Sequence, residues 1–434
     1  MKRPQYHFTP PRNWMNDPSG LIYLDGKYHL FYQHNPHSVK WEHLHWGHAV
    51  SEDLLTWHHL PLALRETEEG VMAYSGCTVF DGNNTSGFGT SDNPPLIAIY
   101  TEADGRIQAQ SLAYSLDRGI NFTLYEDNPV LDIFTPHFRD PRVFWYNDHW
   151  VMAVALAAED TIRFYGSPDL KTWELLSDFG PHGAIADYWE CPDIYPLNLN
   201  GQTRWILQVS VGDHTPMGGS GIQYFVGYFD GVQFTTKQEN VKWMDYGQDF
   251  YAAQSWLNAP QLTTIGWMNN LAYATASPAA EWQGQQSLPR HLSLVNLAGD
   301  TYIKQEPIPI ASHYKDHWHF DKPRGELDFY GDALDIKAKI SGEFTIRVNN
   351  TVIGWVHDSL FVDRSASENI KFHPEVNTRH EAPLFFPLAE VRIVVDTHSV
   401  EVFAGPLTIS SLVFPTKQEL WVGGEVDSLQ VWRS

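Results

Sequence analysis

Three acidic residues that lie far apart in the chain, Asp17, Asp140 and Glu190, each stand at the head of an apolar or aromatic segment. In each case a proline follows within two residues, and a strand-like run, a polar turn and a return run come next. Any one of these acids could merely cap a turn before proline. Three together supply what glycoside hydrolysis needs, one ionised carboxylate and one that holds a proton.

The same layout occurs twice more with polar residues at the head, at Ser75 and at Tyr251. A second repeat, a polar turn that returns an aromatic residue, recurs at Trp57, Phe122 and Trp173, at intervals of about 50 to 65 residues that are typical of propeller blades. Five units predict a five-bladed β-propeller, in which the strand heads meet at the mouth of one central channel. The three acids would then share one pocket.

Near residue 297 the pattern changes, and about seven alternating strands between residues 326 and 432 predict an antiparallel sandwich. We therefore expect an all-β protein, a five-bladed β-propeller followed by a C-terminal β-sandwich. The expected domains are residues 1–300, the propeller catalytic domain, and residues 301–434, the sandwich domain.

The chain of 434 residues carries a formal net charge of -23, which repels phosphate and predicts no nucleic-acid or anionic-membrane partner. No run of about 18 apolar residues and no apolar leader is present, so a cytoplasmic protein is expected, or a secreted one if the sequence was trimmed. Cys77 and Cys191 fit no metal or redox spacing and are interpreted as buried apolar residues, a disulfide being the alternative.

Several motifs in order resemble the β-fructofuranosidases of glycoside hydrolase family 32, the invertases, exo-inulinases and levanases. They are Trp14-Met-Asn-Asp-Pro-Ser-Gly20, Phe31-Tyr-Gln-His-Asn-Pro36, Phe138-Arg-Asp-Pro141, Trp189-Glu-Cys-Pro-Asp193, Asp249-Phe-Tyr-Ala-Ala-Gln254 and Leu288-Pro-Arg290. The resemblance covers nearly the whole chain. Ser19, where the family more often has Asn, and Tyr228, where the exo-fructanase branch has an acid, depart from the pattern and leave the three acids untouched.

The resemblance implies a retaining mechanism with Asp17 as nucleophile, Glu190 as general acid and then base, and Asp140 as stabiliser of the transition state. Retention implies a separation of about 5–5.5 Å between the nucleophile and the acid/base. The candidate contacts to the fructose unit are Asn16, Gln33, Trp41, Ser75, Arg139 and Tyr251. No cofactor is implied, and the spacing of the histidines between His34 and His48 predicts no metal site.

The expected function is an exo-acting β-fructofuranosidase that releases terminal fructose from sucrose, fructo-oligosaccharides, inulin or levan. The alternatives are a fructosyltransferase that makes kestose-type oligosaccharides, a fructan-binding protein without turnover, and another five-bladed glycosidase acting on pentosides. The expected partner is a sugar or fructan, and the sequence leaves the substrate preference and the oligomeric state open.

Overall fold

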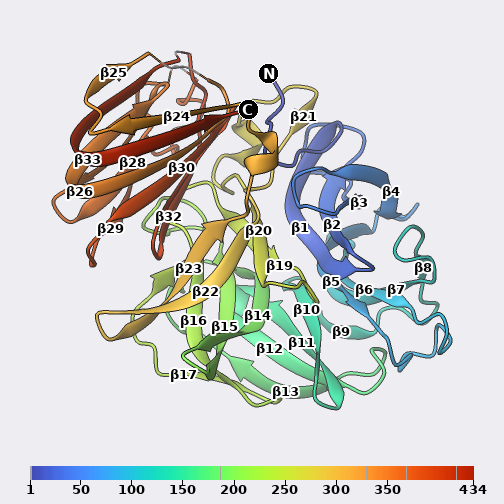
Figure 1. Cartoon of the computed structure of the whole chain (residues 1–434). Coiled ribbons are helices and arrows are strands. Elements are labelled where there is room, and N and C mark those ends of the chain that lie inside the picture. The colour runs from blue at the N-terminus through green and yellow to red at the C-terminus, as the bar shows by residue number, and fades with distance from the viewer. Residues whose placement is uncertain (1, 186, 329–330, 368, 417) are drawn as a thin grey trace.

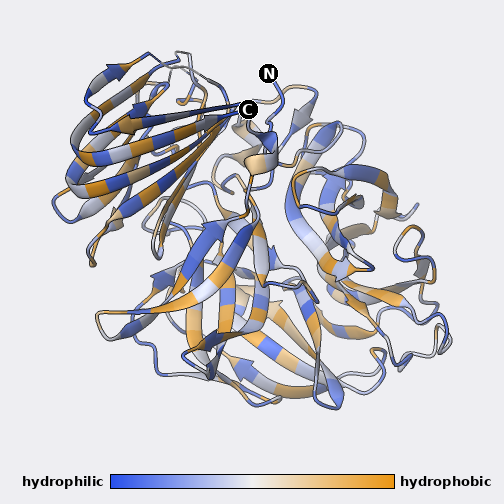
Figure 2. Ribbon diagram, in the orientation of Figure 1, coloured by the Kyte–Doolittle hydropathy of each residue, from blue (hydrophilic) through white to orange (hydrophobic). Residues whose placement is uncertain are grey.

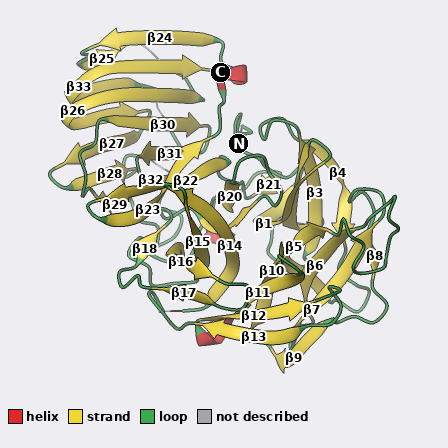
Figure 3. Ribbon diagram, turned by 60° about the horizontal axis from the view of Figure 1, so that its bottom comes forward, coloured by secondary structure: helices red, strands yellow, loops and turns green. Residues whose placement is uncertain are grey.

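The computed structural model describes residues 2–185, 187–328, 331–367, 369–416 and 418–434 (Figure 1). Strands dominate this part of the chain (Figure 3). Its helical segments are single 3-10 turns: η1 (Ala157–Glu159), η2 (Ala274–Ala276) and η3 (Ala311–His313).

The first five sheets in chain order are the blades of a propeller. The first has the order β21-β1-β2-β3-β4, with β1 (Asn13–Leu24), β2 (Lys27–Asn35), β3 (His45–Ser51), β4 (His58–Leu64) and β21 (Trp282–Gln283). The second contains β5 (Met72–Phe80), β6 (Leu96–Ala103), β7 (Gln108–Ser115), β8 (Thr123–Leu124) and β9 (Leu131–Thr135). The third contains β10 (Phe138–Tyr146), β11 (His149–Leu156), β12 (Thr161–Ser167) and β13 (Glu174–Phe179).

The fourth blade contains β14 (Trp189–Leu199), β15 (Gln202–Val211), β16 (Gly221–Phe229), β17 (Phe234–Thr236) and β18 (Lys242–Trp243). The fifth contains β19 (Tyr251–Ser255), β20 (Thr263–Trp267), β22 (Arg290–Leu297) and β23 (Asp300–Pro307).

The inner strands β1, β5, β10, β14 and β19 form a closed ring, each in contact with the next and β19 in contact with β1. Backbone hydrogen bonds join the last blade to the first: the N–H of Tyr23 donates to the carbonyl of Leu257 at 2.8 Å, and the N–H of Leu257 donates to that of Leu21 at 3.1 Å. β11, the second strand of the third blade, is covered by the neighbouring blades, so it is buried along nearly its whole length and its sequence is nearly all apolar (Figure 2).

The predicted Asp-Gly hairpin is present between β1 and β2. Asp25 and Gly26 have φ values of 50° and 84°, the left-handed conformation that a two-residue turn of this kind requires. This turn lies at the opposite end of the hairpin from Asp17.

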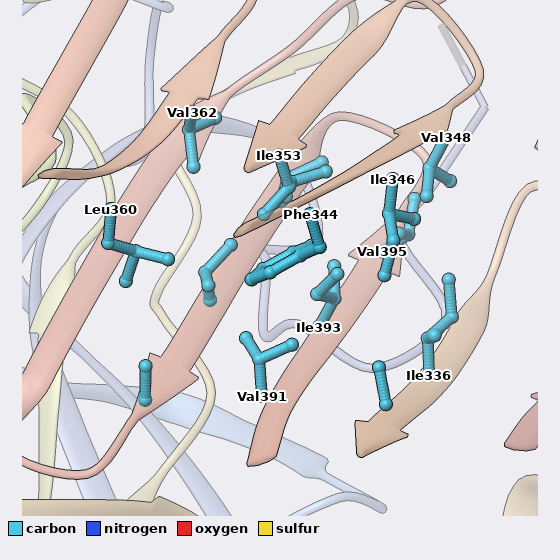
Figure 4. Close-up of a cluster of buried hydrophobic side chains, with 14 of the residues drawn as sticks. Ile336, Phe344, Ile346, Val348, Ile353, Leu360, Val362, Val391, Ile393 and Val395 are labelled. Atoms are coloured by element: carbon cyan, nitrogen blue, oxygen red, sulfur yellow. The ribbon is translucent and has the colours of Figure 1, made fainter. Parts of the chain in front are cut away.

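The remaining strands form a sheet that folds over itself. They are β24 (Asp316–Asp321), β25 (Gly325–Leu327), β26 (Leu334–Val348), β27 (Thr351–Val356), β28 (Ser359–Asp363), β29 (Arg379–Pro383), β30 (Glu390–Asp396), β31 (Ser399–Ala404), β32 (Leu407–Leu412) and β33 (Leu420–Arg433). One half of β26 pairs with β30 and the other half pairs with β27. The sheet therefore divides at β26 into two groups of strands. Figure 4 shows the apolar side chains packed between them, among them Phe344, Leu360 and Ile393.

Buried charges hold the sandwich against the propeller. Arg290 of the fifth blade is ion-paired with Asp245 and with Glu401 of β31. Arg364, which follows β28, is ion-paired with Asp249 at 2.7 Å. Buried pairs of this kind fix one relative placement of the two units, because separating them would leave charges unpaired. The predicted architecture, a five-bladed propeller followed by a sandwich, is confirmed.

Candidate active site

A β-bulge stands near the head of every inner strand of the propeller. In all five, two residues of the inner strand oppose one of its neighbour, between the paired positions 15 and 18, 73 and 76, 139 and 142, 190 and 193, and 251 and 254. The bulge residues Asp140, Cys191 and Ala252 have φ values of 65°, 47° and 51°. A bulge turns a side chain out of the regular alternation of the strand. Asp17, Asp140 and Glu190 lie at or beside these bulges and therefore meet at the mouth of the channel.

One chain of hydrogen bonds joins the first two blades around Asp17. The amide nitrogen of Asn16 donates to Oδ1 of Asp17 at 3.0 Å and to Oε1 of Gln33 at 3.2 Å. Nε2 of Gln33 donates to Oγ of Ser75 at 2.5 Å, and Oγ of Ser75 donates to Oδ2 of Asp17 at 2.8 Å. Both oxygens of the Asp17 carboxylate are thereby oriented.

A second group joins the third, fourth and fifth blades around Glu190. Nε and Nη2 of Arg139 lie 2.9 Å and 2.8 Å from Oε1 of Glu190. The hydroxyl of Tyr251 donates to Oε2 at 2.5 Å. Glu190 is thus held at both oxygens by residues of the neighbouring blades.

Cys191 connects the acids. Its Sγ lies 3.4 Å from Oδ2 of Asp140 and 3.8 Å from Oδ2 of Asp17, and its backbone N–H donates to the same oxygen of Asp140 at 3.0 Å. Since both carboxylates contact one sulfur, Asp17 and Asp140 lie side by side. Cys77 and Cys191 are both buried and free, so the alternative of a disulfide is wrong.

The pKa values reflect this crowding. Burial raises the pKa of Asp17 to about 6, and the charge of Glu190 acts in the same direction against the hydrogen bond from Ser75. Burial and then the charge of Glu190 raise the pKa of Asp140 to about 7, despite the nearby Arg139. Burial also raises the pKa of the Cys191 thiol well above its ordinary value, which keeps it neutral. Carboxylates with pKa values displaced in this way are typical of catalytic sites.

Trp41 lies at the edge of this cluster. Its ring is 44% exposed and meets Tyr74, the neighbour of Ser75, edge to face at 5.8 Å. Trp14 and Trp46 are buried in the propeller. The structure thus brings all nine predicted residues to one mouth, with Trp41 outermost.

Other polar residues of this site are not predicted from the sequence. Gln108 accepts a hydrogen bond from Nη1 of Arg139 at 3.2 Å, and Oγ1 of Thr101 accepts one from the N–H of Asp140 at 2.9 Å. Gln286 donates to the carbonyl of Asn16 at 2.7 Å. These three residues form hydrogen bonds to residues that face the channel, and no pattern in the sequence predicts them.

Among the described residues, no group of three or more His, Cys, Asp and Glu side chains could hold a metal ion. Of the histidines that invite a metal interpretation, His34 bonds the carbonyl of Trp14 and His43 pairs with Glu66. Within the same residues, no helix is long and apolar enough to cross a membrane.

Comparison with known proteins identifies the family of this chain. Residues 7–307 match the description "Glycosyl hydrolases family 32 N-terminal domain", and residues 319–433 match "Glycosyl hydrolases family 32 C terminal". The chain belongs to glycosyl hydrolase family 32. The resemblance inferred from the motifs is thus confirmed, and this family 32 protein is a glycoside hydrolase.

Curated relatives of this family 32 enzyme include the levanase of Bacillus subtilis (strain 168), which is 42% identical over 96% of this chain and 67% of the levanase. An extracellular exo-inulinase of Aspergillus ficuum is 34% identical over 99% of this chain and 93% of that protein.

Solved structures agree with the fold over nearly the full length. The exo-inulinase of Aspergillus awamori superposes with a TM-score of 0.92 at 33% identity, covering 99% of this chain and 98% of the other. The fructofuranosidase of Schwanniomyces occidentalis complexed with fructose gives a TM-score of 0.93 at 29% identity, again over 99% and 98%.

The expectation of a cytoplasmic protein is wrong. Several of the relatives are extracellular exo-inulinases, which points to a secreted protein. The expectation rested on the lack of an apolar leader and of a long apolar run, and neither determines the compartment in which a folded enzyme works.

Proposed function

We propose that this enzyme is a retaining, exo-acting β-fructofuranosidase that removes terminal fructose from fructans and sucrose, with Asp17, Asp140 and Glu190 as its catalytic residues. The observation that supports this best is the meeting of the three acids at one mouth, where Asp17 and Glu190 are each oriented at both oxygens. The levanase and exo-inulinase relatives act on fructans according to their names, so the alternatives of a transferase or a binding protein are not favoured.

In the first step, the ionised carboxylate of Asp17 attacks C2 of the fructosyl unit while Glu190 gives its proton to the glycosidic oxygen. The C2–O bond to the leaving sugar breaks, and an ester between C2 and Asp17 forms. In the second step Glu190 takes a proton from water, whose oxygen attacks C2 from the face that the leaving group vacated. The ester bond between C2 and Asp17 breaks, which releases fructose and the free carboxylate. Two displacements retain the configuration at C2.

Asp140 is proposed to bind hydroxyl groups of the fructose ring as positive charge develops there. Its Oδ2 accepts from Cys191, and its Oδ1 carries no hydrogen bond within the described residues. This oxygen therefore faces a sugar hydroxyl when substrate binds. Asn16, Gln33 and Ser75 lie on the other side of Asp17 and are proposed to bind the same sugar, with Trp41 covering it at the rim.

Chromatography of the products from sucrose, 1-kestose, inulin and levan tests the proposal. Fructose as the only monosaccharide released early from 1-kestose, inulin and levan is the expected result, with sucrose as the co-product from 1-kestose and glucose as the co-product from sucrose, because an exo-enzyme removes one terminal unit at a time. Kestoses as the main product at high sucrose would instead identify a transferase. NMR of the first product should show the β-anomer before mutarotation, and initial release of the α-anomer would exclude the proposed role of Asp17.

That residues 1–300 and 301–434 are separate domains stays a prediction. Limited proteolysis tests it, since a cut between two separately folding units would leave two stable fragments. Strand β23 pairs with β22 of the fifth blade, so a fragment designed to carry the propeller should extend through Pro307.

A further inference from the structure

The rim of the active site beside Glu190 carries aromatic side chains that the mechanism above does not use. Tyr188 precedes Glu190 by two residues, and its ring is 38% exposed. It stacks on His137 with a centroid distance of 5.2 Å and an interplanar angle of 28°, and the guanidinium carbon of Arg139 lies over it at 5.3 Å.

Part of the ring of Tyr188 stays open to solvent. His137, in the bend before β10, stacks on the ring, and the guanidinium of Arg139 in β10 lies over it, yet the side chain remains well exposed. The backbone of Tyr188 is fixed as well, because the N–H of Gly212 donates to its carbonyl at 2.9 Å. The exposed part of the ring is therefore presented to solvent in a defined orientation next to the general acid.

Phe134, three residues before His137, is a second exposed aromatic residue. Its side chain is 80% exposed, and its φ of 58° lies in the left-handed region, which is unfavourable for a bulky side chain. The strained conformation is held by a hydrogen bond from its N–H to Oδ1 of Asp132 at 2.7 Å. Exposure of the phenyl ring to water costs free energy, and so does the left-handed backbone conformation. A functional reason for Phe134 at this position is therefore expected.

Pairing within the second blade connects the strand of Phe134 to the residues that hold the acid. The next residue, Thr135, pairs with Gln108, which accepts a hydrogen bond from Arg139. Arg139 in turn holds Glu190. Phe134 has no direct link to Glu190, whereas Tyr188 contacts Arg139 itself, so Tyr188 is the nearer of the two rings to the acid.

Building on the proposed function, we propose that Tyr188 and Phe134 form an aromatic rim that binds the sugar units on the leaving-group side of the scissile bond. Glu190 protonates the oxygen of the leaving sugar, so that sugar must pass close to the residues that flank Glu190. Aromatic rings offer an apolar face for the C–H face of a sugar. Tyr188 contacts the first leaving-group unit, and Phe134 contacts later units of a fructan chain.

Steady-state kinetics of Tyr188→Ala and Tyr188→Phe on sucrose and inulin tests the inner position. Tyr188→Ala should raise KM about three- to tenfold on both substrates with kcat within about twofold, because stacking of this size contributes to binding before and during the reaction. Tyr188→Phe keeps the ring and should behave like wild type. A lowered kcat with unchanged KM would overturn the proposal, because Tyr188 would then only position Arg139.

Phe134→Ala tests the outer position. It should raise KM for inulin by a similar factor and leave KM for sucrose unchanged, because sucrose has one unit on the leaving-group side. Equal effects on both substrates, or none, would overturn the assignment. So would a change in oligomeric size on gel filtration with an unchanged KM for inulin, since Phe134 would then be a contact between subunits.

Two control variants match these changes. Tyr228 is also an exposed tyrosine, 54% exposed, and has Arg204 over its ring at 5.0 Å, but it lies at the end of the fourth blade opposite Glu190. Leu175 is an exposed apolar residue on β13, the outermost strand of the third blade. Tyr228→Ala and Leu175→Ala should leave both KM values unchanged, and an equal effect from either would contradict the proposal.

The same kinetic measurements distinguish a failure of the proposed function from a failure of the aromatic rim. If the wild-type enzyme releases no fructose from sucrose or inulin, the proposed function fails. If the wild type releases fructose and the Tyr188 and Phe134 variants match it on both substrates, the function stands and the aromatic rim is excluded.

Discussion

Arg139 holds Oε1 of Glu190 through two nitrogens, Nε at 2.9 Å and Nη2 at 2.8 Å. Both contacts are to one oxygen, so Oε2 is free of the guanidinium and accepts a hydrogen bond from the hydroxyl of Tyr251 at 2.5 Å. A proton for the leaving group must sit on an oxygen that is not already occupied by the guanidinium. Oε2 is therefore the oxygen from which we expect the proton to be given.

Replacing Glu190 by alanine should reduce sucrose turnover by about 10²- to 10⁴-fold, the usual contribution of a general acid. On β-fructofuranosyl fluoride, whose leaving group needs no proton, formation of the ester with Asp17 should be much less affected. Stopped-flow measurement of fluoride release checks this. Asp17→Asn is the control and should lose both activities, and sucrose turnover within about tenfold of wild type in either variant would contradict the assigned roles.

Removing the hydroxyl of Ser75 should shift the acidic limb of the kcat/KM profile to higher pH. Asp17 attacks only when ionised, and its pKa of about 6 is held down by the hydrogen bond from Ser75. Ser75→Ala removes that bond, so the pKa of Asp17 rises and more activity is lost at pH 5–6. Ser19→Ala is the matched control, because Oγ of Ser19 is buried and has no hydrogen-bond partner in the part of the chain that the structure describes. An unshifted limb in Ser75→Ala would show that Asp17 does not set it.

Replacing Asp140 by asparagine should stabilise the fold at neutral and alkaline pH. The pKa of Asp140 is about 7 in the folded protein against an ordinary value of 3.8, so its ionised form opposes folding above pH 7. This cost in folding free energy decreases as the pH falls from 7 to 4, because in that range Asp140 binds a proton in the folded state but not in the unfolded state.

Thermal unfolding between pH 4 and pH 8 measures this effect. The midpoint of Asp140→Asn should exceed that of wild type by about 1–3 °C at pH 8, and the two should converge near pH 4. Asp104, an exposed turn residue whose pKa is lowered to about 2 by backbone hydrogen bonds, provides the control. Asp104→Asn should raise the midpoint at no pH, and a stabilisation of Asp140→Asn that is independent of pH would contradict the electrostatic explanation.

His7 should stabilise the contact between the propeller and the sandwich in neutral and acidic solution. Its ring nitrogens lie 2.9 Å from Asp396 and 2.9 Å from Glu401. Burial alone would lower the pKa of His7, but hydrogen bonds to these two acids outweigh it and raise the pKa to about 9. This stabilisation is complete below the ordinary value of 6.5 and is lost as the pH rises through 9.

His7→Gln should therefore lower the unfolding midpoint most at pH 6 and progressively less towards pH 10. Scanning calorimetry across this range checks the trend. His319→Gln removes an exposed histidine that pairs with Asp321 and should change the midpoint little at any pH. A His7→Gln deficit that grows as the pH rises would refute the assignment of charge.

The propeller and the meeting of the three acids could be predicted from the sequence because each blade repeats a carboxylate or polar head, a strand, a turn and a return strand. Asp17 and Ser75 belong to different blades, yet circular repetition alone predicts that they are neighbours. The bulges could not be predicted, since the left-handed φ of Asp140 depends on contacts with the adjoining blade. Nor could the position of Tyr188, because its stack on His137 joins segments from two blades.

The bulge that recurs in all five inner strands presents side chains from three different positions. Asp17 and Ser75 are each the second bulge residue of their strand, Asp140 is the first, and Glu190 and Tyr251 directly precede the bulge. In both matched pairs, the hydroxyl of one blade bonds to the carboxylate of the preceding blade. A redesign of the sugar specificity must therefore change the two members of such a pair together.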